Sequence, residues 1–305
     1  MPRQASLPTY VPPMLAKPSE PFDSPEHIFE IKWDGTRALA YVEAGGYRLM
    51  NRRRVDIAER YPEFRFLEKL PPGTILDGEI VVMDGGKPSF ASLMGREHLR
   101  SNLRIRMASQ QLPAIYVVFD QLYQNHVSIC NLPLSQRKDI LHATVERCNE
   151  PSLVYCTGIV GSGKSFFEQA VERDLEGVVA KRLNSFYLPG KRTDAWRKIK
   201  RAEQVWCAII GYIPDPKEGF RSLVLAAEGA NGLQAVGKVG SGIDGELRAQ
   251  LELLFPKYLA TESSVTCRER ARWLRPGLYC LVSCMERTQR GDLRAPVFLK
   301  LRIDK

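Results

Sequence analysis

One lysine stands at the start of a tight turn, where its amine would face a pocket. Lys32 precedes an Asp34-Gly35 turn, and apolar residues flank this segment on both sides. An apolar stretch, a turn signal and a second apolar stretch indicate a strand, a turn and a strand. A lysine in such a turn projects from a rigid scaffold, but Lys and Asp-Gly are also common in ordinary surface hairpins. Two interpretations therefore stand, a pocket amine and a surface lysine.

Other charged side chains interrupt stretches that otherwise predict strands. Glu79 lies in the apolar segment 75–84. An ionised carboxylate inside a sheet needs a cation, a metal ion or a ligand hydroxyl, although the solvated face of an edge strand is an alternative. Lys198 and Lys200 alternate with Ile199, so both ammonium groups point to one strand face. A bound phosphate would relieve the repulsion between them.

A second candidate phosphate site is segment 158–165, Gly-Ile-Val-Gly-Ser-Gly-Lys-Ser, which matches the phosphate-binding loop G-x-x-x-x-G-K-S. In that hypothesis Lys164 and Ser165 would hold phosphates, and Asp120 would serve a metal site. The loop comes late, however, after a strand-rich region, and no series of βα units follows it. A phosphate-loop NTPase is therefore a competing hypothesis.

The elements that position these residues follow from the apolar patterning. It predicts a proline-rich extended arm over 1–27, strands at 47–51, 75–84, 115–122, 153–160 and 176–182, and a helix over 135–148. After residue 202 short alternating strands recur at 205–213, 222–227, 233–239 and 278–284, with a helix over 244–254. Such a pattern is typical of a small Greek-key barrel of the OB type. We expect two domains, 1–202 and 203–305.

The charge balance favours a polyanionic partner. The 305 residues include 44 Lys and Arg against 35 Asp and Glu, a net charge of +9. The run Arg52-Arg53-Arg54 is a plausible phosphate contact, and the arginines of segment 96–106 are expected to face a polyanion.

Several classes of protein are disfavoured. No apolar run has the roughly 20 residues of a membrane helix, and no apolar stretch follows the N-terminus as in a signal peptide. We therefore expect a cytoplasmic protein. The seven cysteines show no C-x-x-C spacing and only four histidines occur, which disfavours a zinc site or a disulfide framework.

The charged segments occur in a specific order along nearly the whole chain. They are Lys32-x-Asp34-Gly35 with Arg37, Asp77-Gly78-Glu79, Phe119-Asp120, Glu176-Gly-Val-Val-Ala-Lys181, Lys198-x-Lys200 and Arg302-x-Asp304-Lys305. This series resembles the covalent nucleotidyltransferases, and most closely the ATP-dependent DNA ligases. The segments Gly237–Gly242 and Arg294–Leu299 are similar to the ligase domain of bacterial break-repair ligases.

The resemblance implies an α+β fold, with an ATP-grasp-like nucleotidyltransferase domain of antiparallel sheets and flanking helices, followed by an OB-fold barrel. It implies that Lys32 takes AMP from ATP as a phosphoramidate. AMP then passes to the 5′-phosphate of a nick in DNA, and the 3′-hydroxyl attacks and releases AMP. An amine must lose its proton to attack, which nearby cations and a metal ion would favour.

The resemblance also assigns roles to other residues. Glu30 would contact the adenine edge and Phe119 would stack on the base. The expected contacts to ribose and phosphate oxygens come from Arg37, Arg52, Arg192, Lys198 and Lys200, and those to the leaving pyrophosphate from Arg302, Asp304 and Lys305. Glu79 would accept from a ribose hydroxyl or orient a metal ion, and Glu176 would ligate it; Mg²⁺ or Mn²⁺ suits oxygen ligands.

The resemblance leaves some questions open. Leu281 stands where the family usually has an acidic residue. An RNA ligase or a capping-type nucleotidyltransferase shares the lysine motif, and an inactive nucleic-acid-binding scaffold is a non-enzymatic alternative. The expected partners are nicked double-stranded DNA, a DNA end-binding protein and a separate repair polymerase, for a monomer associated with the nucleoid.

Overall fold

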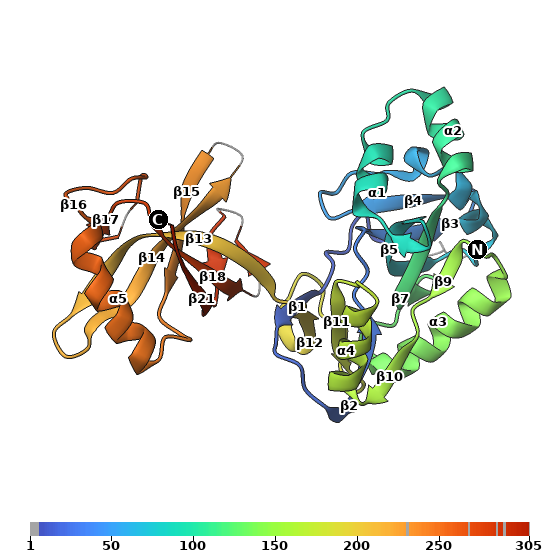
Figure 1. Ribbon diagram of the computed structural model, residues 1–305. Coiled ribbons are helices and arrows are strands. Elements are labelled where there is room, and N and C mark those ends of the chain that lie inside the picture. The colour runs from blue at the N-terminus through green and yellow to red at the C-terminus, as the bar shows by residue number, and fades with distance from the viewer. Residues whose placement is uncertain (1–5, 230–231, 268, 285, 289–290, 305) are drawn as a thin grey trace. The chain divides into compact units, whose positions relative to one another are not determined.

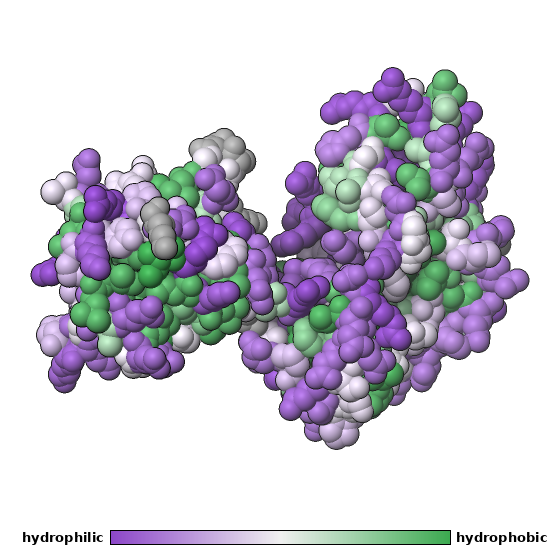
Figure 2. All heavy atoms as spheres, viewed as in Figure 1, coloured by the Kyte–Doolittle hydropathy of each residue, from purple (hydrophilic) through white to green (hydrophobic). Residues whose placement is uncertain are grey.

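The computed structural model describes residues 6–229, 232–267, 269–284, 286–288 and 291–304. The chain divides into two compact units, Met1–Lys200 and Arg201–Lys305, and each is described by itself. Helices accompany mostly antiparallel sheets in both units, as expected for an α+β fold. Figure 2 shows hydrophilic residues over most of the visible face of the first unit, in keeping with the high charge of the chain.

The first sheet of the first unit contains the strand that leads to Lys32. Its order is β1 (Leu15–Pro18), β12 (Arg192–Lys200), β11 (Gly177–Arg182), β2 (Ser24–Ile31) and β10 (Gly158–Gly161). β11 pairs antiparallel with both β2 and β12 and lies between them. Helix α4 (Gly163–Glu172) packs against β11 and β2, where Phe29, Val178 and Ile199 are fully buried.

The second sheet forms the larger core of this unit (Figure 1). Its order is β4 (Gly46–Asn51), β3 (Thr36–Glu43), β5 (Thr74–Asp84), β7 (Ala114–Gln124) and β8 (Val127–Ser128), with β6 (Lys87–Pro88) on β5 and β9 (Leu153–Tyr155) on β7. The 3-10 helices η1 (Ala58–Arg60) and η2 (Pro62–Lys69) and the α-helices α1 (Phe90–Glu97), α2 (Asn102–Gln111) and α3 (Leu134–Cys148) accompany it.

The chain crosses between the two sheets at Lys32. β2 and β3 do not pair, so the interpretation of this segment as a surface hairpin is wrong. Lys32 still follows the first sheet, since its backbone N–H donates to Gly177 O at 2.9 Å. The turn then packs so closely on β5 that a Cβ on Gly35 would lie 2.2 Å from Ile80 O, which requires glycine there. The amine is thereby held between the sheets.

A second crossing corrects the prediction of one strand over 153–160. The segment forms two short strands in different sheets, β9 parallel to β7 and β10 antiparallel to β2. The chain of the first unit therefore passes from one sheet to the other at two places, at Lys32 and between β9 and β10. Residues from both sheets surround the space between them.

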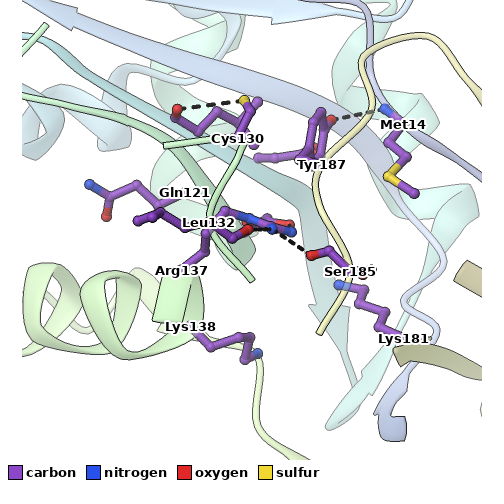
Figure 3. A network of polar contacts seen from close by, with 12 residues as sticks. Met14, Gln121, Cys130, Leu132, Arg137, Lys138, Lys181, Ser185 and Tyr187 are labelled. Atoms are coloured by element: carbon purple, nitrogen blue, oxygen red, sulfur yellow. Dashed lines mark hydrogen bonds and ion pairs between the residues drawn. The ribbon is translucent and has the colours of Figure 1, made fainter. Parts of the chain in front are cut away.

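Arg137 ties α3 to the second sheet through a buried ion pair (Figure 3). Its guanidinium donates to both carboxylate oxygens of Asp120 at 2.8 Å and to the backbone oxygens of Leu132 and Ser185 at 2.7 and 2.9 Å. Both charged side chains are fully buried. Asp120 is thus a structural partner of Arg137, which differs from the metal-site role of the phosphate-loop hypothesis.

The arginines of segment 96–106 differ in their surroundings. Arg96 is buried and paired with Glu63 at 2.5 Å, so its expected exposure to a polyanion is wrong. Arg100, Arg104 and Arg106 are exposed, as predicted. The seven cysteines are all free thiols, as the sequence indicated.

The second unit is a strand-rich fold with a large hydrophobic core and a smaller second cluster around Ala208, Ile210 and Val224. Its elements are β13 (Glu203–Asp215), β14 (Gly219–Gly229), β15 (Gly232–Val239), α5 (Gly245–Tyr258), β16 (Leu259–Ala260), β17 (Arg272–Leu274), β18 (Leu278–Cys284), β19 (Glu286–Arg287), β20 (Leu293–Arg294) and β21 (Val297–Ile303). The long, bent β13 pairs with β14, β17 and β18, and β18 also pairs with β21. The Asp244 side chain caps α5, as the predicted helix start requires.

The Arg137–Asp120 pair makes a stability prediction. Arg137→Met keeps an apolar stem but leaves the Asp120 carboxylate buried and uncompensated, so unfolding free energy should fall by about 3–5 kcal/mol. Denaturant unfolding measures this loss. Arg65→Met is the matched control, because Arg65 pairs with Glu68 while 81% of its side chain is exposed, and it should cost nothing measurable. Equal losses in the two variants would contradict the prediction.

Candidate active site

A cavity of about 260 Å³ lies in the first unit and contains most of the predicted site residues. Side chains from both sheets line it, which follows from the crossing at Lys32. The predicted residues in its lining are Glu30, Lys32, Arg37, Arg52, Glu79, Phe119, Arg192 and Lys198. The structure therefore gathers residues that are as far as 168 positions apart between Glu30 and Lys198.

At one side of the cavity Lys32 meets Glu176 and Lys200. The Lys32 ammonium donates to one Glu176 carboxylate oxygen, and the Lys200 ammonium lies 2.5 Å from the other. Burial would raise the pKa of Glu176, but Lys32 and Lys200 outweigh that effect and hold it below its usual value. Glu176 thus stays ionised between two ammonium groups, and it fixes the Lys32 side chain in position.

Gly177 explains how Glu176 reaches this place. Its φ of +142° is one that glycine adopts readily, and a Cβ there would lie 2.1 Å from Ile199 O. The chain can therefore enter β11 directly against β12, which carries Lys200.

Glu79 faces Arg37 across the β3–β5 ladder. Burial raises the pKa of its carboxyl to about 8, because the Arg37 and Lys32 charges offset only part of the desolvation. Glu79 is therefore largely protonated at neutral pH, when it can donate a hydrogen bond as well as accept one. The sequence prediction that this acid lies inside the sheet is confirmed.

Arg37 is held by the protein itself. Its Nε and Nη2 donate to the two Asp77 oxygens at 2.9 and 2.6 Å, and its Nη1 donates to Met14 O at 2.7 Å. The Tyr187 hydroxyl also donates to Asp77, at 2.7 Å. Arg37 consequently shapes the cavity wall and anchors the N-terminal arm, and few of its donors remain for a ligand.

Glu30 and Phe119 lie at the far end of the cavity, where Glu30 pairs with two lysines that the sequence left without a role. Lys181 is part of the lining, and Lys138 lies outside it. Lys138 and Lys181 pair with the two Glu30 oxygens, the second at 2.6 Å. The Lys181 ammonium also lies 4.1 Å from the Phe119 ring centroid. Lys138 was missed because it lies outside the motifs. The sequence pattern that could have found Lys138 is its place between Leu134 and Leu141 on the apolar face of the predicted helix, where a charged side chain needs a buried partner.

The predicted residues Glu176, Lys200, Arg302 and Asp304 are not among the residues that line this cavity. Lys200 and Glu176 adjoin it through Lys32. Arg302 and Asp304 belong to the second unit, where they pair at 3.2 Å, and Lys305 lies outside the described residues. Arg52 and Arg192 line the cavity while remaining exposed.

The phosphate-loop match has a packing explanation. The Lys164 backbone N–H at the start of α4 donates to the Asp23 carboxylate at 2.9 Å, and that negative charge disfavours a phosphate there. A Cβ on Gly163 would lie 2.2 Å from the Phe29 ring, so this glycine permits close packing. The segment therefore serves as the turn into α4.

Across residues 6–229, 232–267, 269–284, 286–288 and 291–304, no group of three or more His, Cys, Asp or Glu side chains forms a metal cluster. No helix in the described parts of the chain is long and apolar enough to cross a bilayer.

Comparison with known families finds two matches that together cover most of the chain. The model "ATP dependent DNA ligase domain" matches residues 13–200, and "ATP dependent DNA ligase C terminal region" matches residues 216–305. The chain is also similar to the SPbeta prophage-derived DNA ligase-like protein LigB of Bacillus subtilis, with 32% identity over 67% of this chain and 72% of that protein.

Longer proteins match the whole chain with part of their length. The multifunctional non-homologous end joining protein LigD of Pseudomonas aeruginosa is 30% identical over 98% of this chain but only 36% of that protein. Among solved structures, the ligase domain of Mycobacterium tuberculosis LigD has a TM-score of 0.59 at 28% identity, covering 97% and 96% of the two chains. A mycobacterial DNA ligase D complexed with ATP has a TM-score of 0.56 at 28% identity, with the same coverage.

The pKa of Glu79 predicts a pH-dependent stability. The carboxyl has an ordinary pKa of 4.5 and a pKa of about 8 in the folded protein, so the folded state binds more protons between these values. Stability from this group is therefore lost as pH rises through that window. Glu79→Gln cannot ionise, so its Tm should fall less from about pH 6 to about pH 8.5 than that of the unchanged protein. Thermal unfolding in metal-free buffer measures the difference, and parallel curves would contradict the assignment.

Proposed function

This chain belongs to the ATP-dependent DNA ligase family, and from that membership we propose that Lys32 carries AMP between ATP and a nicked DNA. Family membership confirms the expected adenylation domain followed by an OB-fold domain, and the expected activity of a DNA ligase that uses ATP. It favours DNA ligation over the RNA ligase, capping, phosphate-loop and scaffold alternatives.

The position of Lys32 carries the proposal. Its amine lies in the cavity between the sheets and beside Lys200. In the first step the Lys32 Nζ forms a bond to the α-phosphorus of ATP, the bond to pyrophosphate breaks, and the amine loses its proton. A 5′-phosphate oxygen of the nick next displaces Lys32 from AMP. The 3′-hydroxyl then displaces AMP and joins the strands.

Glu176 and the β12 lysines prepare the first step. Glu176 holds the Lys32 ammonium until ATP binds, and Lys32 must leave this carboxylate to reach the phosphorus. Lys198 lines the cavity and lies two residues from Lys200 on β12, so both can neutralise α-phosphate oxygens as negative charge develops. Positioning and electrostatics thus supply most of the catalysis.

The residues present fit a hard divalent cation such as Mg²⁺ or Mn²⁺, which binds one or two carboxylates together with substrate phosphates. Glu176 and Glu79 would hold it, with Glu79 deprotonated. When bound, such an ion polarises phosphate oxygens and neutralises charge on the leaving group.

The rest of the cavity would bind the nucleoside. Glu30 would face the adenine edge and Phe119 the plane of the base. The exposed Arg52 and Arg192 are placed to reach ribose and phosphate oxygens, and Arg37 supports that wall through Asp77.

In the second unit, Arg302 would act on the leaving pyrophosphate together with Asp304 and Lys305. Its guanidinium lies 4.8 Å from the Trp206 ring centroid and 4.7 Å from that of Tyr279, and its Nε pairs with Asp304, so the phosphate oxygens would meet the two Nη groups. The two aromatic rings would hold this side chain in one orientation before it meets ATP.

We also propose a role in repairing DNA breaks. The similarity to the ligase segment of multifunctional end-joining proteins supports it, and the chain spans about a third of their length. A DNA end-binding protein and a separate repair polymerase would then act beside this chain at the nucleoid. Its net charge of +9 suits binding to DNA phosphates.

The proposal is tested by the covalent adduct. With α-labelled ATP, Lys32→Ala should form no acid-labile, base-stable AMP adduct and should seal no nicks, because the amine is gone. Lys164→Ala is the control, since Lys164 is exposed outside the cavity and should leave the adduct intact. Denaturing gels measure both. The ligase mechanism is wrong if Lys32→Ala is still labelled and Lys164→Ala is not.

The role of Arg302 makes a second prediction. Arg302→Ala should slow formation of the lysyl-AMP adduct by about 100-fold, the usual cost of removing one charged donor from a transition state. Sealing of a nick that already carries AMP needs no pyrophosphate release and should change little. Single-turnover assays of the two steps measure this, and Lys300→Ala on the same strand is the control. Equal loss in both steps would restrict Arg302 to a structural role.

A further inference from the structure

The Glu30 carboxylate lies at the buried end of the cavity between two ammonium groups. Glu30 is 1% exposed and lies near the end of β2, two residues before Lys32. Lys138 Nζ bonds one carboxylate oxygen and Lys181 Nζ lies 2.6 Å from the other. A buried carboxylate is costly when it stands alone, and these two cations compensate its charge.

Lys138 reaches Glu30 from outside the cavity. It projects from α3 (Figure 3), is 4% exposed, and is not part of the cavity lining. Its ammonium also donates to Cys156 O at 2.7 Å and lies 4.3 Å from the Tyr155 ring centroid. Burial would lower the pKa of Lys138, but the Glu30 charge outweighs it and raises that pKa above its usual value. Lys138 is therefore a fixed cation directed at Glu30.

An ionised carboxylate in this place accepts hydrogen bonds and donates none. Its two oxygens offer about four acceptor sites, of which Lys138 takes one by a hydrogen bond, while Lys181 lies beside the other oxygen as an ion-pair partner. The ammonium of Lys181 faces the Phe119 and Trp196 rings at 4.1 and 4.3 Å, so its remaining hydrogens point to aromatic faces. The polar group that this end of the cavity presents to a base is thus an acceptor.

We propose that Lys138 is the residue that makes this ligase selective for a purine with an amine at C6, because it holds Glu30 as a fixed, ionised acceptor. The inference rests on the proposed function, in which Glu30 faces the base. Adenine places an N–H donor against this carboxylate. Guanine and hypoxanthine place a carbonyl oxygen there, and two acceptors repel each other. Lys138 touches no nucleotide and acts through Glu30 as a positioning residue.

Without Lys138, Glu30 keeps a single cation and is free to rotate. A rotated carboxylate no longer holds an acceptor against the C6 group of the base. The selectivity of the cavity then falls, whereas a purely structural Lys138 would affect all nucleotides equally.

The test compares ATP with inosine triphosphate, which differs from ATP only at the N1–C6 edge of the base. Both nucleotides, α-labelled with different isotopes, are mixed in one tube, and the ratio of the two lysyl adducts is read from the same protein. This ratio does not depend on the fraction of the protein that is active. The unchanged chain should strongly prefer ATP, and Lys138→Met should reduce the preference at least about 10-fold, the effect of losing one polar discriminating contact.

Two further variants complete the experiment. Gln136→Met on the exposed face of α3 is the matched control and should keep the original ratio. Glu30→Gln presents an N–H₂ group to the base and should lower the ratio even if Lys138→Met yields no active protein. The inference is overturned if Lys138→Met keeps the original ratio. If Lys138→Met yields no active protein, it is overturned when Glu30→Gln keeps that ratio. It is also overturned if the unchanged chain does not distinguish the two nucleotides. A chain that forms no adduct on Lys32 with ATP would instead refute the proposed function.

Discussion

Charges that are removed from water and then paired with one another hold the catalytic unit together. Asp120 receives Arg137, Asp77 receives Arg37, and Glu30 receives two lysines. Breaking one such buried pair costs about 3–5 kcal/mol, because the remaining charge has no solvent to replace its partner. Each charge needs one particular partner, whereas an apolar side chain can pack against many. These pairs therefore specify which strands and helices lie together.

The same pairing gives the site its chemistry. Lys32 and Lys200 bond directly to Glu176 and hold it ionised, and Glu176 in turn fixes the Lys32 amine. The charges of Arg37 and Lys32 offset only part of the desolvation of Glu79, so Glu79 is largely protonated at neutral pH. Two carboxyl groups in one site thus differ in charge because their surroundings differ. The first therefore pairs with ammonium groups, and the second can donate a hydrogen bond as well as accept one.

The path of the chain between the sheets explains how so small a cavity collects its residues. The first sheet supplies Glu30, Lys181 and Lys198, and the second supplies Glu79 and Phe119. The turn at Lys32 joins the sheets at the cavity itself, so the Lys32 amine stands on the connection that any relative motion of the sheets would disturb. Close packing of Gly35 on β5 limits that motion. This packing, together with the pairing to Glu176, restricts the position of the amine, as the proposed attack on ATP would require.

The sequence by itself determined the order of the charged motifs, the strands and helices that carry them, and the family that they indicate, because these depend on residue type and local spacing. Only the tertiary structure decided that β2 and β3 belong to different sheets, since pairing across a turn depends on distant strands. It also placed Lys138 against Glu30, 108 positions away in the chain. Burial and partners set whether a charged side chain is a surface group, a structural ion pair or a site residue, and both arise from contacts that no local pattern encodes.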